Sequence, residues 1–254
     1  MPPRIPTEAD FSPLLQTLPH TLHFPSPPES TTTFLILFHG LGDSDVPFAS
    51  FARNLNLPGV LAISVRGTSV LPPALFGGER PGFHWGDDVA MDPSTGDLAE
   101  DPGFEKATKA VMEKLIGEVL IDKCGWEMRD IIFFGFGQGG SLALGLASSL
   151  RQAARVTDIT EGERQSPGNT NFKGAISIGG PLPQSMIPTV SSREKSRTNV
   201  LVCQLNEDAV DAVKREFEDV RVVQWKRREV AMPRDREEVL PLMQFFADRL
   251  RNAW

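Results

Sequence analysis

The sequence predicts an α/β fold with a mostly parallel central sheet and helices on both of its faces. Two observations support this prediction. Short apolar runs rich in strand-forming residues alternate with segments of helical periodicity along most of the 254-residue chain, which is the order typical of a parallel sheet. Several of these runs are continuously apolar, as in strands buried on both faces. The length fits one domain, since α/β folds of roughly 250 residues are often undivided.

The chain divides into a leader and one domain. Residues 1–30 contain Pro-Ser-Pro-Pro at positions 25–28 and little periodicity, so we expect a loosely structured leader with a short edge strand at 21–24. Residues 31–254 then form a single α/β domain. The polar stretch 155–171 is predicted to be a surface insertion in that domain.

Strands and helices alternate regularly within the domain. Strands are predicted at residues 33–38, 60–65, 130–134, 174–178, 200–204 and 220–225. Helices are predicted at residues 48–55, 104–122, 141–150, 210–217 and 237–251, the last of them amphipathic. Residues 68–103 lack a regular pattern, and we expect them to form an ordered cover over the edge of the sheet.

The composition narrows the classes of function. The 26 basic and 33 acidic side chains give a formal charge of −7, which argues against nucleic acid or an anionic membrane surface as a partner. Cys124 and Cys203 lie far apart without a CxxC or Cys/His cluster, so we expect reduced thiols and no zinc. No stretch approaches the roughly 18 apolar residues of a membrane span, and we expect a cytoplasmic protein without stable membrane insertion. Acidic pairs in the loops are typical of solvated carboxylates, so we expect no metal and no cofactor.

A glycine-rich turn follows the strand at 130–134. The sequence Gly-Phe-Gly-Gln-Gly at 135–139 has the spacing of the nucleophile elbow G-x-S-x-G, with Gly137 at the position of the serine. The alternative is a plain glycine-rich turn or a phosphate cradle. The cradle fits poorly, because no acidic residue ends the following strand and the turn comes after the third buried strand rather than the first.

A second motif follows the first buried strand. His-Gly-Leu-Gly-Asp at 39–43 stands where α/β-hydrolases place a loop that lends a backbone N–H to the oxyanion hole. The two donors would be the amides of Leu41 and Gln138. For His39 we prefer a role in organising this loop over a role in proton transfer.

With these pieces together, the chain resembles the phospholipase/carboxylesterase family of the α/β-hydrolase superfamily, which includes the acyl-protein thioesterases. The shared pieces span most of residues 33–251 and are F-H-G-L-G-D (38–43), G-F-x-Q-G-G (135–140), I-S-I-G-G-P (176–181) and E-x-x-x-x-M-x-F-F-A-D-R-L (238–250). Members hydrolyse acyl esters and thioesters with Ser, Asp and His in that order along the chain. By position, the resemblance puts the nucleophile at Gly137, the acid at Asp208 and the base near Met232. Only the acid matches. Position 137 is glycine instead of serine, and the four histidines, His20, His23, His39 and His84, all lie far before Met232 in the chain.

The resemblance implies a small acyl ester or thioester, or an acylated protein, as the ligand. We expect little or no turnover, because Gly137 has no attacking atom and the base is missing as well. One alternative is an active hydrolase with a displaced nucleophile, chosen from Ser44, Ser141 and Cys203, and with His84 as the substitute base. Another alternative is a non-catalytic scaffold whose partners contact the 155–171 insertion or the acidic surface. The oligomeric state stays open.

Aromatic residues of the long cover are candidates for an acyl-binding wall. They are Phe76, Phe83 and Trp85, and proteins that this chain resembles have such a wall. The alternative, given equal weight, is a small satellite core beneath the loop.

Overall fold

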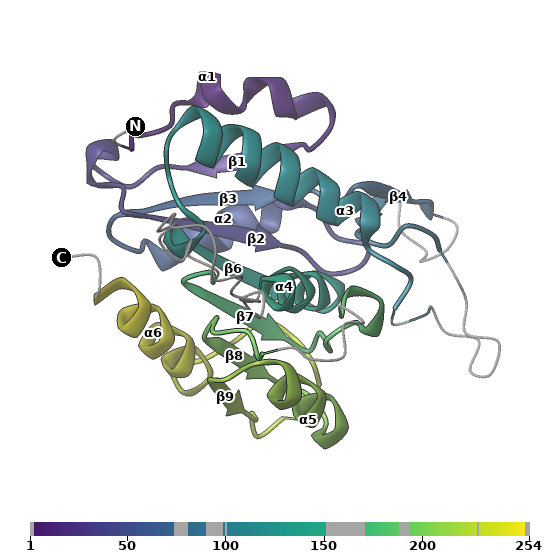
Figure 1. The fold of residues 1–254 in the computed structure, drawn as a ribbon. Helices are drawn as coiled ribbons and strands as arrows, with labels where there is room; N and C mark the ends of the chain where they lie inside the picture. The colour runs from purple at the N-terminus through teal and green to yellow at the C-terminus, as the bar shows by residue number, and fades with distance from the viewer. Residues whose placement is uncertain are drawn as a thin grey trace, which may run out of the picture.

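The computed structural model describes residues 3–73, 81–89, 99, 101–150, 171–187, 194–227 and 229–251. A seven-stranded sheet crosses the molecule in the order β1-β3-β2-β6-β7-β8-β9 (Figure 1). Its strands are β1 (His20–His23), β2 (Thr33–Phe38), β3 (Val60–Val65), β6 (Ile131–Phe136), β7 (Gly174–Ile178), β8 (Val200–Cys203) and β9 (Val220–Val223). β1 runs antiparallel to β3, and every other pairing is parallel. The predicted class, a mostly parallel sheet, is confirmed.

The central strand β2 fixes which ends of the strands meet. All six of its residues are buried, as expected for a strand with a neighbour on each side and a helix layer on each face. Phe38 pairs with Val65 of β3 on one side and with Gly135 of β6 on the other. The carboxyl ends of β2, β3 and β6 therefore lie together at one edge of the sheet, where α/β proteins bind their ligands.

Helices cover both faces of this sheet (Figure 1). They are α1 (Glu8–Phe11), α2 (Asp45–Leu55), α3 (Glu105–Lys109), which continues into a π-type helical segment (Ala110–Lys123), α4 (Gln138–Ser149), α5 (Glu207–Glu216) and α6 (Arg236–Leu250). Buried residues of α3 and its continuation, α4 and α5 belong to one core cluster, and those of α2 and α6 belong to a second. Successive residues of β2 supply the two clusters in turn, because side chains alternate across a strand.

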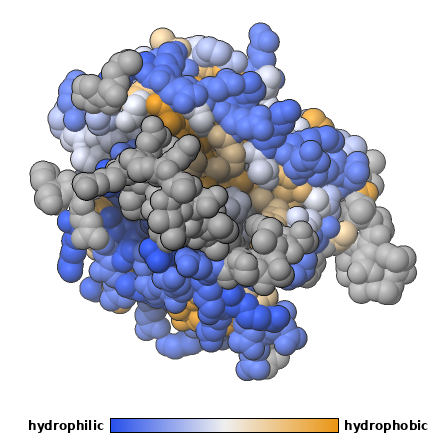
Figure 2. Space-filling model, viewed as in Figure 1, coloured by the Kyte–Doolittle hydropathy of each residue, from blue (hydrophilic) through white to orange (hydrophobic). Residues whose placement is uncertain are grey.

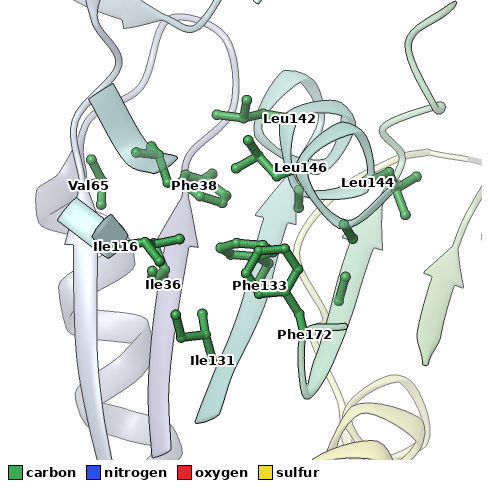
Figure 3. Close-up of a cluster of buried hydrophobic side chains, with 14 of the residues drawn as sticks. Ile36, Phe38, Val65, Ile116, Ile131, Phe133, Leu142, Leu144, Leu146 and Phe172 are labelled. Atoms are coloured by element: carbon green, nitrogen blue, oxygen red, sulfur yellow. The ribbon is translucent and has the colours of Figure 1, made fainter. Parts of the chain in front are cut away.

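The first cluster packs around β2, β6 and α4. Figure 3 shows Leu142 and Leu146 of α4 above Phe38 and Phe133 of the sheet. The ring centroids of Phe133 and Phe172 lie 4.5 Å apart, within the range of favourable aromatic pairs. This cluster fixes α4 against β6 and thereby positions the turn between them.

Residues 3–30 are regularly structured, whereas the sequence predicts a loosely structured leader; the expected edge strand is present as β1. Residues 3–30 form α1, a short 3-10 helix (Ser12–Gln16), the edge strand β1 and a second short 3-10 helix (Pro28–Ser30). Phe11, Leu14 and Leu18 are buried in the first core cluster. Their spacing of three and four residues puts them on one face of a helical segment, and the many prolines of the segment mask this pattern in the sequence.

The described parts of the long cover form a small second sheet. β4 (Ser69–Leu71) pairs antiparallel with β5 (Gly82–His84), and Phe83 makes a further bridge to Asp43. The cover is thereby fastened to the loop that follows β2. The predicted insertion at 155–171 lies, apart from Asn171, outside the described residues.

Several helices begin earlier than the periodicity predicts. α5 starts at Glu207 because the Asn206 side chain accepts a hydrogen bond from the backbone N–H of Ala209, a standard N-cap. α4 starts at Gln138, directly after the glycine-rich turn.

Hydrophilic residues cover most of the described surface in the view of Figure 2, and hydrophobic residues gather in a band beside the helix formed by α3 and its continuation. Within the described part of the chain, no helix is long and apolar enough to cross a membrane.

Candidate active site

Gly137 lies in a sharp turn between β6 and α4. Its backbone has φ 52° and ψ −124°, a conformation that L side chains rarely adopt. The N–H of Gly137 donates to the carbonyl oxygen of Ile178 at 2.8 Å, and its own carbonyl accepts from the N–H groups of Gly140 and Ser141. This strand–turn–helix arrangement is the structural context that a nucleophile elbow requires.

The glycines around Gly137 are there for a different reason. A Cβ added at Gly135 would lie 2.1 Å from the carbonyl oxygen of Gly139, and one added at Gly139 would lie 2.4 Å from that of His39. A Cβ added at Gly137 would meet nothing closer than the Cα of Gly40, at 3.9 Å. The neighbouring glycines are therefore required by close packing, whereas position 137 has room for a side chain.

The loop after β2 lies against this turn. His39 is fully buried; its Nε2 accepts from the N–H of Gly67 at 2.8 Å, so its Nδ1 carries the proton and donates to the carbonyl oxygen of Gly40 at 2.7 Å. Burial lowers the pKa of the His39 imidazole, which keeps the ring neutral. Both ring nitrogens are thus used to hold the loop, which matches the role preferred from the sequence.

The two residues proposed as oxyanion donors have backbone N–H groups without a partner among the described residues. Leu41 follows the His39–Gly40 turn, and its N–H donates to no described residue. Gln138 is the first residue of α4, so its N–H has no intrahelical partner either. The Gln138 side chain accepts from the N–H of Trp85 at 2.8 Å and ties the cover to the start of the helix.

A cavity of about 220 Å³ brings these groups together. Leu41, Gly137 and Gln138 line it, together with His84 and Ser141. The rest of its described lining comes from Asp88, Val89, Ala99, Pro102, Gly179 and Pro181. Position 137 and both proposed oxyanion donors therefore share one hollow at the carboxyl edge of the sheet.

The cavity lining also includes a histidine and a serine, His84 and Ser141. His84 is 3% exposed and Ser141 is 1% exposed, and the side chains of both lack a hydrogen-bond partner among the described residues. Burial lowers the pKa of the His84 imidazole, and the Lys106 ammonium lowers it further. The neutral imidazole is the form that can accept a proton from a hydroxyl.

Asp208 lies in an adjoining cavity. It belongs to the first turn of α5 and is exposed. The cavity it lines has a volume of about 530 Å³ and shares Gly179 and Pro181 with the first. No described side chain makes a hydrogen bond or an ion pair with its carboxylate.

The region predicted to hold the base approaches the site through Val230 rather than Met232. A Cβ added at Gly179 would lie 2.1 Å from Cγ1 of Val230, and Val230 lines the cavity that contains Asp208. The Met232 side chain instead packs against the second core cluster. Val230, two residues before Met232, is therefore the residue of this region that lines the cavity with Asp208.

A partly buried ion pair, which has no signal in the sequence, holds this loop in place. The Arg227 guanidinium lies 2.9 Å from the Glu238 carboxylate and donates to the carbonyl oxygens of Ala231 and Met232. Glu238 also accepts from the backbone N–H of Arg234. Both ends of the loop are thus fixed to the start of α6.

Two of the three aromatic residues proposed for an acyl wall, Phe83 and Trp85, do not line either cavity. Trp85 is fully buried, packs edge-on against Phe38 and donates from its indole to the carbonyl oxygen of His39. Phe83 lies under the Arg66 guanidinium, 4.9 Å from it, and does not line either cavity. Both belong to the packing beneath the cover, which favours the second of the two alternatives, a small satellite core, for these two residues. Phe76 lies outside the described residues.

Metal chemistry has no candidate site in this part of the structure. Among the residues described, no group of three or more His, Cys, Asp or Glu side chains is placed to hold a metal ion.

The parallel sheet, the elbow-like turn and the loop after β2 define an α/β-hydrolase. The phospholipase/carboxylesterase family model matches residues 22–204, and the chain belongs to that family. Two curated relatives are uncharacterized hydrolases, one of Schizosaccharomyces pombe, 42% identical over 112 residues, and one of Mycosarcoma maydis, 34% identical over 125 residues. These matches cover 43% and 48% of this chain and 44% of each relative, so the chain spans less than half the length of the relatives it matches.

Solved structures show the same fold at low sequence identity. Zea mays acyl-protein thioesterase 2 has a TM-score of 0.60 and 18% identity, covering 91% of this chain and 98% of that chain. Esterase PE8 has a TM-score of 0.64 and 16% identity, covering 92% and 100%. The Bacillus cereus carboxylesterase has a TM-score of 0.59 and 14% identity, covering 96% and 100%.

Proposed function

We propose that this protein binds an acyl ester, an acyl thioester or an acylated protein at the Gly137 cavity and hydrolyses it slowly or not at all. The observation that carries the proposal is Gly137 itself. It has the backbone conformation of a nucleophile elbow and room for a side chain, and it faces a cavity with two amides that have no described partner. The site keeps the geometry of acyl recognition and lacks the attacking atom.

The chemistry explains why turnover is slow. Acyl transfer through a triad needs an oxygen nucleophile, a base that takes its proton and a carboxylate that orients the base. Asp208 supplies only the third group. The amides of Leu41 and Gln138 can polarise a bound carbonyl oxygen. In serine proteases without a working triad, the oxyanion hole and substrate binding together leave about 10³–10⁴-fold catalysis over water.

A restoration series tests this assignment. We expect Gly137→Ser combined with Val230→His to gain thioester hydrolysis that neither single variant shows. Met232→His in place of Val230→His should gain less, because the Met232 side chain packs into the core. Gly125→Ser is the matched control, since Gly125 also has a positive φ, of 76°, but does not line either cavity. Turnover by the unmodified protein above roughly 1 s⁻¹, within the ordinary range of enzymes, would contradict the proposal.

A second candidate function rests on Ser141 and His84, which line the same cavity. In this version the Ser141 hydroxyl attacks the carbonyl carbon, His84 takes its proton and then returns it to the leaving group, and water releases the acyl group in a second step. A fluorophosphonate probe should then label Ser141. Labelling should vanish in Ser141→Ala, fall in His84→Ala and persist in Ser149→Ala, at the far end of the same helix. An unlabelled protein removes this candidate.

A cytoplasmic location is part of the proposal. Cys124 and Cys203 are both free and buried, which supports a reducing compartment. Cell fractionation tests this point.

A further inference from the structure

Asp208 is a carboxylate without the partner that a triad would give it. In a Ser-His-Asp triad the carboxylate is hydrogen-bonded to the histidine. Here the loop opposite Asp208 presents the apolar Val230, and no described residue pairs with the Asp208 side chain. An exposed carboxylate in a cavity of about 530 Å³ is free to pair with a charge that a ligand brings.

The described lining of both cavities carries negative charge only. Asp88 belongs to the first cavity, Asp101 and Asp208 belong to the second, and no lysine or arginine of the described residues lines either. Asp88 and Asp208 have no described side-chain partner, whereas Asp101 accepts from the N–H and hydroxyl of Ser185. One cation near the first cavity is Lys106, which lowers the pKa of His84 and whose ammonium donates to the backbone carbonyl of Asp87 at 2.9 Å.

The backbone amides and the carboxylates of the site favour different features of a ligand. The amides of Leu41 and Gln138 suit the oxygen of an uncharged acyl carbonyl. The carboxylates beyond Gly179 and Pro181 repel an anion and attract a cation. A free fatty acid, an acyl phosphate or the thioester of a phosphorylated carrier would bring negative charge to this lining.

We infer that the site selects acyl compounds whose leaving-group side carries positive charge, such as an acylated peptide with flanking lysines. The uncharged carbonyl is held near Gly137, and the ammonium group lies against Asp208. This inference rests on the proposed function, because it names the ligand class of the same cavity.

The test uses three peptides that differ only in charge. Each is a tripeptide whose central diaminopropionate carries an octanoyl amide, which resists hydrolysis, and whose flanking residues are both Lys, both Ala or both Glu. Binding to the full chain is measured by calorimetry at low and at high salt. We expect the Lys peptide to bind about tenfold more tightly than the Glu peptide at low salt, with the Ala peptide between them, since exposed charge pairs are individually weak. The contrast should shrink at high salt.

Variants locate the effect. Asp208→Asn should reduce the ratio of the Lys-peptide affinity to the Ala-peptide affinity at least about threefold. Asp219→Asn is the matched control, because Asp219 is exposed just before β9, at the opposite edge of the sheet, and should keep the full preference.

The outcomes separate the inference from the proposed function. Equal binding of all three peptides, tighter binding of the Glu peptide, or a preference that Asp208→Asn leaves intact overturns the charge selection while acyl binding stands. No binding of any peptide overturns both. Graded binding that depends on Asp208 and on salt supports both.

Discussion

Gly137 holds a backbone conformation that a serine adopts only with strain. Residues held in such sparsely populated regions cost of order 1–3 kcal/mol. We therefore expect Gly137→Ser to lower the free energy of unfolding by ~1 kcal/mol, measured by denaturant titration. Gly139→Ser should cost far more, because its Cβ would lie 2.4 Å from two backbone carbonyl oxygens. A Gly137→Ser variant as stable as the parent would argue against the strained turn.

The buried histidines predict a pH dependence of stability. Burial lowers the pKa of both His39 and His84, so below the usual value of about 6.5 the unfolded chain binds more protons than the folded one. The contribution of the two neutral histidines to the free energy of unfolding should therefore be fully present above about pH 6.5, and it should fall as the pH drops below that value. Denaturant titrations between pH 7.5 and 5.5 measure this slope.

Replacing His84 tests how much of this pH dependence of the free energy of unfolding comes from its imidazole. His84→Gln should make the pH dependence of the free energy of unfolding shallower than it is in the parent. A slope that is the same in the parent and in His84→Gln would show that His84 is not held neutral by its surroundings.

Single residues could be predicted from the sequence where they belong to short motifs. Gly137, Leu41 and Gln138 belong to motifs in which a few consecutive residues fix the turn, and the structure brings all three to one cavity. Val230 could not be singled out in the same way. Its place opposite Gly179 depends on the Arg227–Glu238 ion pair, and a contact between a loop and a distant helix leaves no periodic signal.

At the scale of elements, the N-terminal segment shows a tertiary contact overriding a local pattern. The Asp10 carboxylate accepts from both terminal nitrogens of Arg4 and from the N–H of Thr7, and it lies 2.9 Å from the Lys123 ammonium. α1 is thereby fastened to the end of the helical segment that follows α3. The prolines predict a loosely structured leader, but the sequence pattern contains no sign of the contact with Lys123.

This contact predicts an acid-sensitive contribution to stability. The Arg4 guanidinium, aided by Thr7 and Lys123, holds the pKa of Asp10 well below its usual range. Asp10→Asn should lower the free energy of unfolding by about 1–2 kcal/mol at pH 7, a charge-assisted hydrogen bond being worth about that much and its partners being half-exposed. This difference in the free energy of unfolding between the parent and Asp10→Asn is largest above the usual aspartate pKa of about 3.9. It is lost as the pH falls through the lowered pKa of Asp10. Glu8→Gln, exposed on the same helix, is the control, and an equal loss in both variants would contradict the role of Asp10.

For the whole molecule, the two-layered core follows from the alternation of the strands. A continuously apolar strand such as β2 needs apolar helices on both faces, so the α/β class and the order of the main elements could be predicted from sequence. What could not be predicted is which helix covers which face. The structure assigns α2 and α6 to the face opposite α4, and the crossovers that decide this are set by three-dimensional packing.

The separation of the two faces predicts that stability and ligand binding can be changed independently. Leu242 of α6 is 1% exposed in the second core cluster, whereas Leu240 on the same helix is 48% exposed. Leu242→Ala should lower the free energy of unfolding by about 2–5 kcal/mol through the lost contacts and the cavity left behind. Leu240→Ala, the same change on the solvent side, should stay within about 0.5 kcal/mol. Since the Gly137 cavity lies at the carboxyl edge of the sheet, with α4 on the other face, both variants should bind the uncharged octanoyl peptide with the parent's affinity when measured well below their melting temperatures. A weaker affinity in Leu242→Ala alone would show that α6 transmits its packing to the site through the loop that Arg227 and Glu238 hold.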